Sequence, residues 1–330
     1  MDYHGEKMGK AMTAIELASR VKESYSLDWI FENVKVGLNL AKEYGVTHIR
    51  AFADVDSKAK LEGIKALLKA KEEFKGVVEL QVVAFPQDGV ERESEAYNLV
   101  REAVKMGADV VGGIPWIELT EKDEETHIDK MFEIALEFDK DISMLVDDAG
   151  DPTLKTLEKL AIKTLETGYM GRVLAHHARA MSMYPMQYLM KLIALLKKSG
   201  ISIVTDPHTG PLHVPVKELL SSDILLSLGQ DDILDAYYPY GRNNMLEVAF
   251  LASHILWMTT AADMEALYDM ITKNPAKAMR INDYGIELGK TANLVVLNAP
   301  NVLEALRFYE KPLYVISHEN FFKVMELFSN

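Results

Sequence analysis

Short β-branched runs alternate regularly with longer amphipathic stretches along this chain of 330 residues, and no other feature constrains its fold as strongly. Each run is bounded by Gly, Pro or Asp, and successive runs begin about 30 residues apart, the length of a βα unit. They predict strands at residues 46–53, 77–85, 108–115, 142–147, 172–177, 201–205 and 224–228. Helical patterns lie between them, for example at 59–74, 93–106 and 186–198. This order predicts an α/β protein whose parallel sheet is covered by helices.

Two architectures cover a parallel sheet in this way, the doubly wound sheet and the (β/α)8 barrel. No glycine-rich phosphate-binding motif opens a helix, which weakens the nucleotide-binding doubly wound alternative. Polar residues gather where five strands end, at 85–88, 147–148, 176–177, 206–208 and 230–232. Because a barrel keeps its active site at this end of its strands, the sequence predicts a (β/α)8 TIM-type barrel. Only seven strands are found, so the first strand is missing or atypical.

A small β appendage is predicted after the last helices of the barrel, which we place at residues 243–260 and 262–279. A strand led by glycine lies within residues 288–297, and another apolar run covers 312–316. We therefore assign residues 1–285 to the (β/α) barrel and residues 286–330 to the C-terminal β segment of a small sandwich domain.

Charge and composition exclude several classes of function. The chain has 36 Lys and Arg against 50 Asp and Glu, and its net charge of −14 repels phosphate backbones and anionic lipid. No apolar run approaches the roughly eighteen residues of a membrane span, and no signal peptide is apparent. We expect a cytoplasmic protein that binds neither nucleic acid nor a membrane. With no cysteine, any metal must be held by His, Asp or Glu.

The strand ends that carry His177, Asp148 and Asp231 would converge at one barrel mouth. An imidazole and several carboxylates suit a hydrolytic divalent metal, which acidifies bound water while a neighbouring carboxylate moves protons. The simpler structural explanations are a hydrogen-bonded imidazole without metal, aspartates that cap a following helix, and an ordinary loop after residue 148. His176 is adjacent to His177 in a strand, so alternation predicts that only one of the two faces the site. His208 and His213 are either substitute ligands or ordinary loop residues.

Five blocks occur in the same order as in a known family. They are residues 49–55 (IRAFADV), 80–89 (LQVVAFPQDG), 107–115 (GADVVGGIP), 172–181 (RVLAHHARAM) and 229–241 (GQDDILDAYYPYG). They resemble the cytosine deaminase branch of the amidohydrolase superfamily. The resemblance implies a (β/α)8 barrel with a small β-sandwich that hydrolyses C–N bonds of cyclic amidines and amides. It also implies one divalent metal, such as zinc, iron or manganese.

Position by position, the resemblance assigns roles to six residues. His177 and Asp231 match residues that hold or neighbour the metal, and with Asp148 they form the expected catalytic set. Asp231 would accept the proton of the attacking water, and Asp148 stands where the family has a proton-shuttling glutamate. The substrate-binding set is Gln87, which hydrogen-bonds the ring, Asp232, a carboxylate at the substrate, and Tyr237, an aromatic residue lining the ring. The implied substrate is a small heterocycle, and the superfamily's habit of associating implies a homo-oligomer.

The chain departs from the family at several metal ligands. It begins Met1-Asp2 without the His-x-His pair of the first strand, and Leu145 replaces the fifth-strand histidine. Phe52 and Gln230 also replace histidines. One hypothesis explains these losses together with the missing strand: an N-terminal segment of the family is absent, which would also leave the strand near 294–297 without a partner.

Three hypotheses about function stay open. The first is a metal-dependent hydrolase that deaminates a small cyclic amidine or amide. The second is a metal-free binding protein or pseudoenzyme that keeps the pocket. The third is an inactive, N-terminally truncated fragment of such a hydrolase. Metal content after purification without chelator separates the first from the second.

Overall fold

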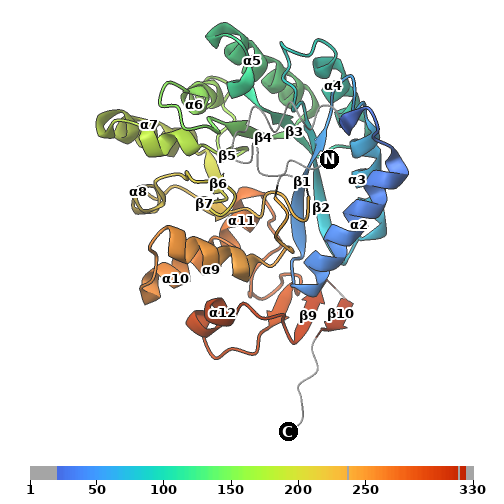
Figure 1. The fold of residues 1–330 in the computed structure, drawn as a ribbon, viewed down its shortest axis with the longest axis vertical. Helices are drawn as coiled ribbons and strands as arrows, with labels where there is room; N and C mark the ends of the chain where they lie inside the picture. Colours follow the sequence, from blue (N-terminus) through green and yellow to red (C-terminus); the bar gives the residue numbers. More distant parts are fainter. Residues whose placement is uncertain (1–20, 236–237, 319, 325–330) are drawn as a thin grey trace.

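Seven parallel strands form one curled sheet in the computed structural model, which describes residues 21–235, 238–318 and 320–324. Strand order follows the chain, from β1 to β7, as in a TIM-type fold (Figure 1). The strands are β1 (His48–Asp54), β2 (Glu79–Phe85), β3 (Val110–Gly113), β4 (Asp141–Val146), β5 (Val173–His177), β6 (Ser202–Thr205) and β7 (Leu226–Leu228). The seven predicted strands are all present, with ends shifted by a few residues.

Helices flank the outer face of this sheet (Figure 1). They are α2 (Leu27–Glu43), α3 (Glu62–Glu73), α4 (Ala96–Met106), α5 (Glu121–Phe138), α6 (Thr156–Glu166), α7 (Met186–Ser199), α8 (Val216–Ser221), α9 (Met245–Ile255), α10 (Ala261–Asp269) and α11 (Lys273–Ala278), with short 3-10 turns η1 (Pro115–Ile117) and η2 (Arg179–Met183). Polar caps set some starts: Ser26 accepts from the N–H of Trp29, and Thr120 accepts from that of Asp123. The core lies between helices and sheet, as with the fully buried Phe132 and Met144.

The helices predicted at 243–260 and 262–279 are shorter than expected. The first ends at Ile255, and the second is divided into α10 and α11 by a break at residues 270–272. Pro275 explains the second difference, because proline tolerates the first turn of a helix but not its interior. A periodic apolar pattern does not reveal such a break by itself.

A second, antiparallel sheet follows the barrel. It contains β8 (Leu294–Val296), β9 (Tyr314–Ser317) and β10 (Asn320–Lys323) in the order β10-β9-β8, with α12 (Val302–Phe308) between the first two strands. The expectation that the strand near 294–297 lacks a partner is wrong, because it pairs with β9. Neither β10 nor α12 was predicted from the sequence pattern.

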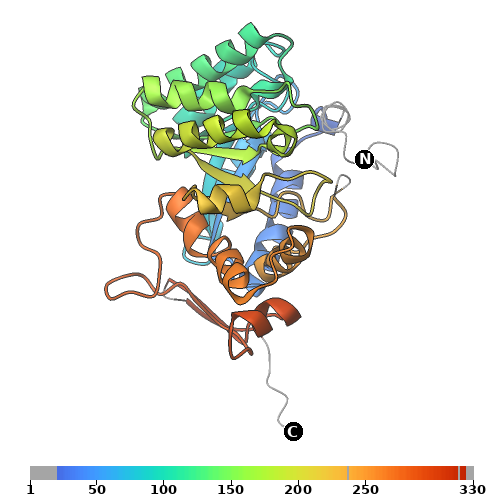
Figure 2. The same ribbon diagram turned by 90° about the vertical axis from the view of Figure 1, so that its left-hand side faces the viewer.

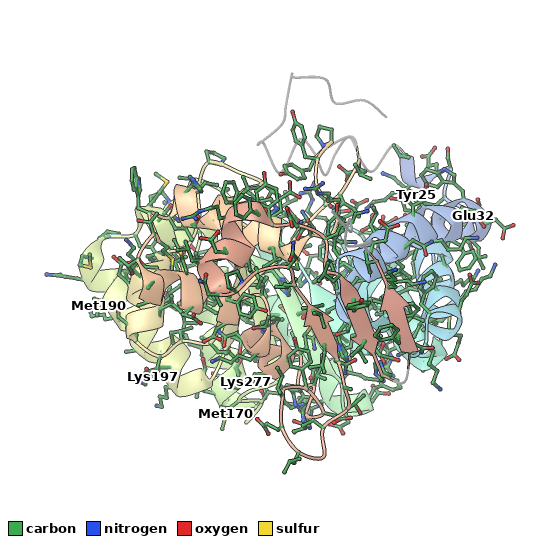
Figure 3. The ribbon with its side chains drawn as sticks, turned by 90° about the horizontal axis from the view of Figure 1, so that it is seen from below. Tyr25, Glu32, Met170, Met190, Lys197 and Lys277 are labelled. Carbon is green, nitrogen blue, oxygen red and sulfur yellow. The ribbon has the colours of Figure 1, made fainter. Side chains whose placement is uncertain are left out.

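This C-terminal sheet lies at one end of the molecule, beside α2 (Figures 2 and 3). The Nζ of Lys42 lies 4.2 Å from the ring centre of Phe322, and the Nζ of Lys311 lies 2.6 Å from Oε2 of Glu43. Gly45 ends the turn after α2 with φ +77°, and a Cβ there would lie 2.2 Å from Val295 Cγ1. Glycine is therefore required where the two parts meet.

The sheet is open in the described part of the chain, since β1 and β7 are each paired with one neighbour. A cavity of about 1210 Å³ lies against both edge strands and is lined by residues from the carboxyl ends of several strands. Within the described ranges, no helix combines the length and apolar character needed to cross a bilayer.

Candidate active site

Five of the six predicted site residues line this one cavity. They are Gln87 after β2, Asp148 after β4, His177 at the end of β5, and Asp231 and Asp232 after β7. Parallel strands deliver their carboxyl ends to the same rim, which explains the convergence. The sixth, Tyr237, lies outside the described residues.

Three side chains form a compact set of metal-type donors: His177, Asp206 and Asp231 each offer a ligand atom, all within 4.8 Å of one another. His177 Nδ1 lies 2.9 Å from Asp206 Oδ1, and Asp231 opens onto the cavity. One nitrogen and two oxygens match the donor count of a catalytic zinc site, which keeps a position for water or substrate. Asp206 was missing from the predicted ligand set, although it lies in the polar cluster at 206–208.

Two consecutive residues in the left-handed region shape the end of β5. His177 has φ +65° and Ala178 has φ +48°, values that non-glycine residues rarely adopt. The expectation that His176 and His177 face opposite sides is wrong, because this turn breaks the alternation and both residues line the cavity. The ring of His176 meets that of Phe52 edge-on at 5.0 Å, and within the described residues its Nε2 is buried without a hydrogen bond. Backbone strain of the kind seen at His177 and Ala178 is characteristic of functional sites.

Arg179 is a site residue that sequence analysis missed. Its Nη1 donates to Asp148 Oδ1 at 2.7 Å, and its Nη2 donates to Asp206 Oδ2 at 2.5 Å. A Cβ at Gly210 would lie 3.1 Å from the guanidinium carbon, so glycine leaves room for this fork. The only signal in the sequence was one arginine after a strand end, which is too common to single out. The guanidinium thus holds two carboxylates of the site at fixed positions.

Charges of both signs are concentrated here. Burial disfavours the imidazolium form of His177, but Asp148 and Asp206 outweigh it and raise the pKa of His177 to about 10. Burial likewise opposes ionisation of Asp206, yet His177 and Arg179 hold its pKa well below the usual range. Enclosure by the cavity walls and the neighbouring Asp206 carboxylate raise the pKa of Asp231 far above that range. Burial, with Asp235 nearby, raises the pKa of Asp232 to about 7.

Asp147 and Asp148 are adjacent but differ in environment. Asp147 is fully buried and accepts hydrogen bonds from the N–H groups of Thr156 and Leu157 and from the hydroxyl of Tyr184. It therefore anchors the start of α6. Asp148 lies 3.9 Å from His177 Nδ1 on the cavity side. Although the two aspartates are neighbours at the same strand end, Asp147 stabilises α6 and Asp148 faces the cavity.

Asp231 and Asp232 do not act as helix caps. In the described part of the loop after Asp232, the next helix begins at Met245, so neither aspartate caps a helix directly after it. Their place at the cavity therefore leaves them available to a ligand.

His208 and His213 bond to the backbone of nearby loops. His208 donates from Nε2 to the carbonyl of Gln230 at 3.1 Å, and His213 donates from Nδ1 to that of Val214 at 3.0 Å. Among described residues, neither belongs to the donor cluster. Both are ordinary loop histidines in this structure.

Comparison with known protein families identifies the family to which this chain belongs. A family model described as "Amidohydrolase family" matches residues 6–321. The chain belongs to the amidohydrolase family. This amidohydrolase is 37% identical, over 276 residues, to N-isopropylammelide isopropyl amidohydrolase of Pseudomonas sp. strain ADP, covering 83% of this chain and 68% of that protein.

Two solved structures are similar to the amidohydrolase. The 5-methylcytosine deaminase from Klebsiella pneumoniae, liganded with 5-fluorocytosine, has a TM-score of 0.93 and 31% identity, covering 97% of this chain and 81% of that one. The N-isopropylammelide isopropylaminohydrolase from Burkholderia multivorans has a TM-score of 0.80 and 26% identity, with coverages of 86% and 73%. These relatives confirm the resemblance to the cytosine deaminase branch. They support an enzyme that hydrolyses carbon–nitrogen bonds.

Proposed function

We propose that the chain is a metal-dependent hydrolase that deaminates a small cyclic amidine or amide. One observation carries the proposal: the His177, Asp206 and Asp231 donor set lies in the same cavity as Gln87 and Asp232. A hydrolytic centre and groups suited to hold a polar ring are thus available to one ligand. The similarity to a deaminase liganded with 5-fluorocytosine supports a planar heterocycle as substrate.

The donor set fits one divalent metal, such as zinc, iron or manganese. His177, Asp206 and Asp231 would hold it, one histidine nitrogen and two carboxylate oxygens. Enclosure in the cavity and clustered carboxylates raise the pKa of Asp231, and a divalent cation would relieve the crowding of these like charges. When bound, a metal of this type would acidify the water molecule that it holds.

The chain's own carboxylates would move the protons. Asp231 opens onto the cavity and would accept the proton of the attacking water. Asp148, on the cavity wall with its Oδ1 held by Arg179, would relay the proton taken from the water to the departing nitrogen. Gln87 and Asp232 would orient the ring. Arg179 thus keeps Asp148 pointed in one direction through the reaction.

We also propose a cytoplasmic homo-oligomer that acts on a free small molecule. The net charge of −14 supports this choice of partner, because it disfavours contact with nucleic acid and anionic lipid. Tyr237 remains a proposed ring-lining residue.

A metal-free binding protein is the second candidate. Phe52 and Leu145 present apolar surface to the cavity at positions where the family resemblance implies histidines. Arg179 already pairs with Asp148 and Asp206, so part of the acidic charge is balanced without a metal. A pocket of this kind could hold a polar ring without hydrolysing it.

Metal content and product release decide between the two. The protein is purified without chelator, its zinc, iron and manganese are quantified, and ammonia release from cytosine and amine release from N-isopropylammelide are measured. The hydrolase proposal expects close to one metal per chain and release that stops in Asp231→Asn but continues in Asp151→Asn, an exposed loop control. No metal and no release, even after metal is added, would leave the binding protein.

A further inference from the structure

A fully buried lysine lies next to the substrate side of the cavity. The side chain of Lys22, just before α2, has no exposed surface. Its Nζ lies 2.8 Å from Asp56 Oδ2, 3.0 Å from Asp88 Oδ1 and 3.4 Å from Asp54 Oδ2. Burying an ammonium is costly unless opposite charges surround it, and here they come from the last residue of β1 and from the loops after β1 and β2. The lysine therefore fastens the entry to α2 onto the rim of the barrel.

Asp54 links this lysine to Gln87. With its Nε2 directed at Asp54, the Gln87 amide donates to both carboxylate oxygens, at 2.9 and 3.0 Å. An ionised carboxylate only accepts hydrogen bonds, so the opposite orientation would set the Gln87 carbonyl against two acceptors. The nearby ammonium favours the ionised form of Asp54, opposing the effect of burial, which raises the pKa of that carboxyl. Both Asp54 and Gln87 line the cavity.

We infer that Lys22 and Asp54 are positioning residues that hold the Gln87 amide with Oε1 available to the ligand, so that the site selects a ring presenting an N–H donor there. This inference rests on the proposed function in one respect, the assignment of Gln87 as a ring contact. Beyond the proposed function, it specifies that the ring presents an N–H donor to Gln87. Neither Lys22 nor Asp54 needs to touch the ligand for this selection.

The selection has a simple physical basis. A ring nitrogen that carries only a lone pair would face the lone pairs of Gln87 Oε1, and both groups would stay unpaired. Sites built to hydrogen-bond a particular group discriminate strongly against analogues that lack it. One unsatisfied polar contact corresponds to about a tenfold or larger loss of affinity.

Two probes test the donor requirement. 5-Fluorocytosine carries a ring N–H beside a carbonyl, whereas the ring nitrogens of 4-amino-5-fluoropyrimidine are acceptors only. Dissociation constants for both are measured by isothermal titration calorimetry with the protein as isolated. We expect the wild-type protein to bind 5-fluorocytosine at least about tenfold more tightly.

Two isosteric variants locate the cause. In Asp54→Asn the new amide can donate to Gln87 Oε1, so the Gln87 amide can turn and the preference should fall to about threefold or less. Asp56→Asn is the matched control, because it also removes one negative charge beside Lys22. Asp56, however, accepts from the N–H groups of Lys58 and Ala59 rather than from Gln87. This variant should keep the wild-type preference. Lys22→Met should behave like Asp54→Asn, with thermal unfolding used to confirm that each variant is folded.

An unchanged preference in Asp54→Asn, or an equal loss in Asp56→Asn, would overturn the inference. Failure of the wild-type protein to bind either probe would overturn it as well. Ammonia release is measured separately, so a protein that hydrolyses cytosine but keeps its preference in Asp54→Asn would retain the proposed function and lose only this inference. Binding with the expected preferences but without hydrolysis would retain this inference and contradict the proposed function.

Discussion

Nδ1 of His127 lies 2.7 Å from Oε1 of Glu118, and neither side chain is exposed. Nε2 of the same ring accepts the N–H of Ile114 at 3.0 Å, so the ring is neutral and carries its proton on Nδ1. Glu118 also accepts from the N–H groups of Val90 and Arg92. The pair thus joins the end of β3 to the loop after Gln87.

Acid should weaken the fold through this pair. Burial outweighs the attraction of Glu118 and lowers the pKa of His127, so below about pH 6.5 the unfolded chain binds a proton that the folded chain refuses. Stability from this residue is therefore present above that pH and is lost as pH falls, by up to about 1.4 kcal/mol per unit. Urea unfolding between pH 7.5 and 5 measures the slope.

The matched comparison is His127→Gln, since other histidines contribute to the total slope. We expect the variant to be less stable at pH 7.5 but to lose stability less steeply between pH 6.5 and 5. Parallel slopes for the two proteins would show that His127 titrates normally.

Asp147 should matter for stability rather than for metal binding. Asp147→Asn turns an acceptor of several buried hydrogen bonds into a partial donor, so the free energy of unfolding should fall by about 2–4 kcal/mol. Asp151→Asn, which alters an exposed loop contact with Thr153, should change it by less than about 0.5 kcal/mol. Metal content should be equal in both folded variants. A large loss of metal in Asp147→Asn alone would contradict this division of roles.

Removing the Arg179 guanidinium should misplace Asp148 and Asp206 together. We expect Arg179→Met to lower kcat/KM for ammonia release by about a hundredfold, the scale on which a small displacement of catalytic groups acts. Arg179→Lys should recover little, because one ammonium cannot replace a planar fork that binds two carboxylates. Arg101→Met, which breaks a surface pair with Glu137, serves as control. Wild-type kinetics in Arg179→Met would refute a positioning role.

Asp206 should contribute directly to metal affinity. Asp206→Asn removes one charged donor from a set of three, so the affinity for zinc should fall by about tenfold or more. Competition with a chelating dye measures this affinity. Asp223→Asn, at an exposed pair with Lys197, should leave it unchanged. Equal affinities in the two variants would remove Asp206 from the ligand set.

Local pattern predicted the sheet because each strand carries its own signal. The run that became β2 is buried from Val82 to Phe85, and the sequence shows this directly as an apolar stretch. Breaks and pairings were harder to predict. The division between α10 and α11 interrupts a continuous periodic pattern near Pro275, and the partner of β8 lies in a later segment of the chain. The polar residues at strand ends also identified five residues that line the cavity.

Side-chain partnerships inside the cavity could not be predicted in the same way. The left-handed backbone at His177 contradicts strand alternation, and only the folded turn reveals it. Arg179 and Lys22 are an ordinary arginine and lysine in the sequence, and their roles come from carboxylates on other loops. The residue types in the sequence indicated the chemistry of the site, while tertiary contacts determined which individual arginine, lysine and aspartate residues take part in it.

Contacts between the C-terminal part of the chain and its early elements bear on synthesis. Gln81 donates to the carbonyl of Met279 across 198 positions, and Asn320 donates to that of Gly76 across 244. These partners are translated long after β1 and β2 leave the ribosome. Part of the surface of the early elements therefore stays exposed until the C-terminal residues have been synthesised. We expect folding to finish late in translation and the nascent chain to depend on chaperones that shield this surface.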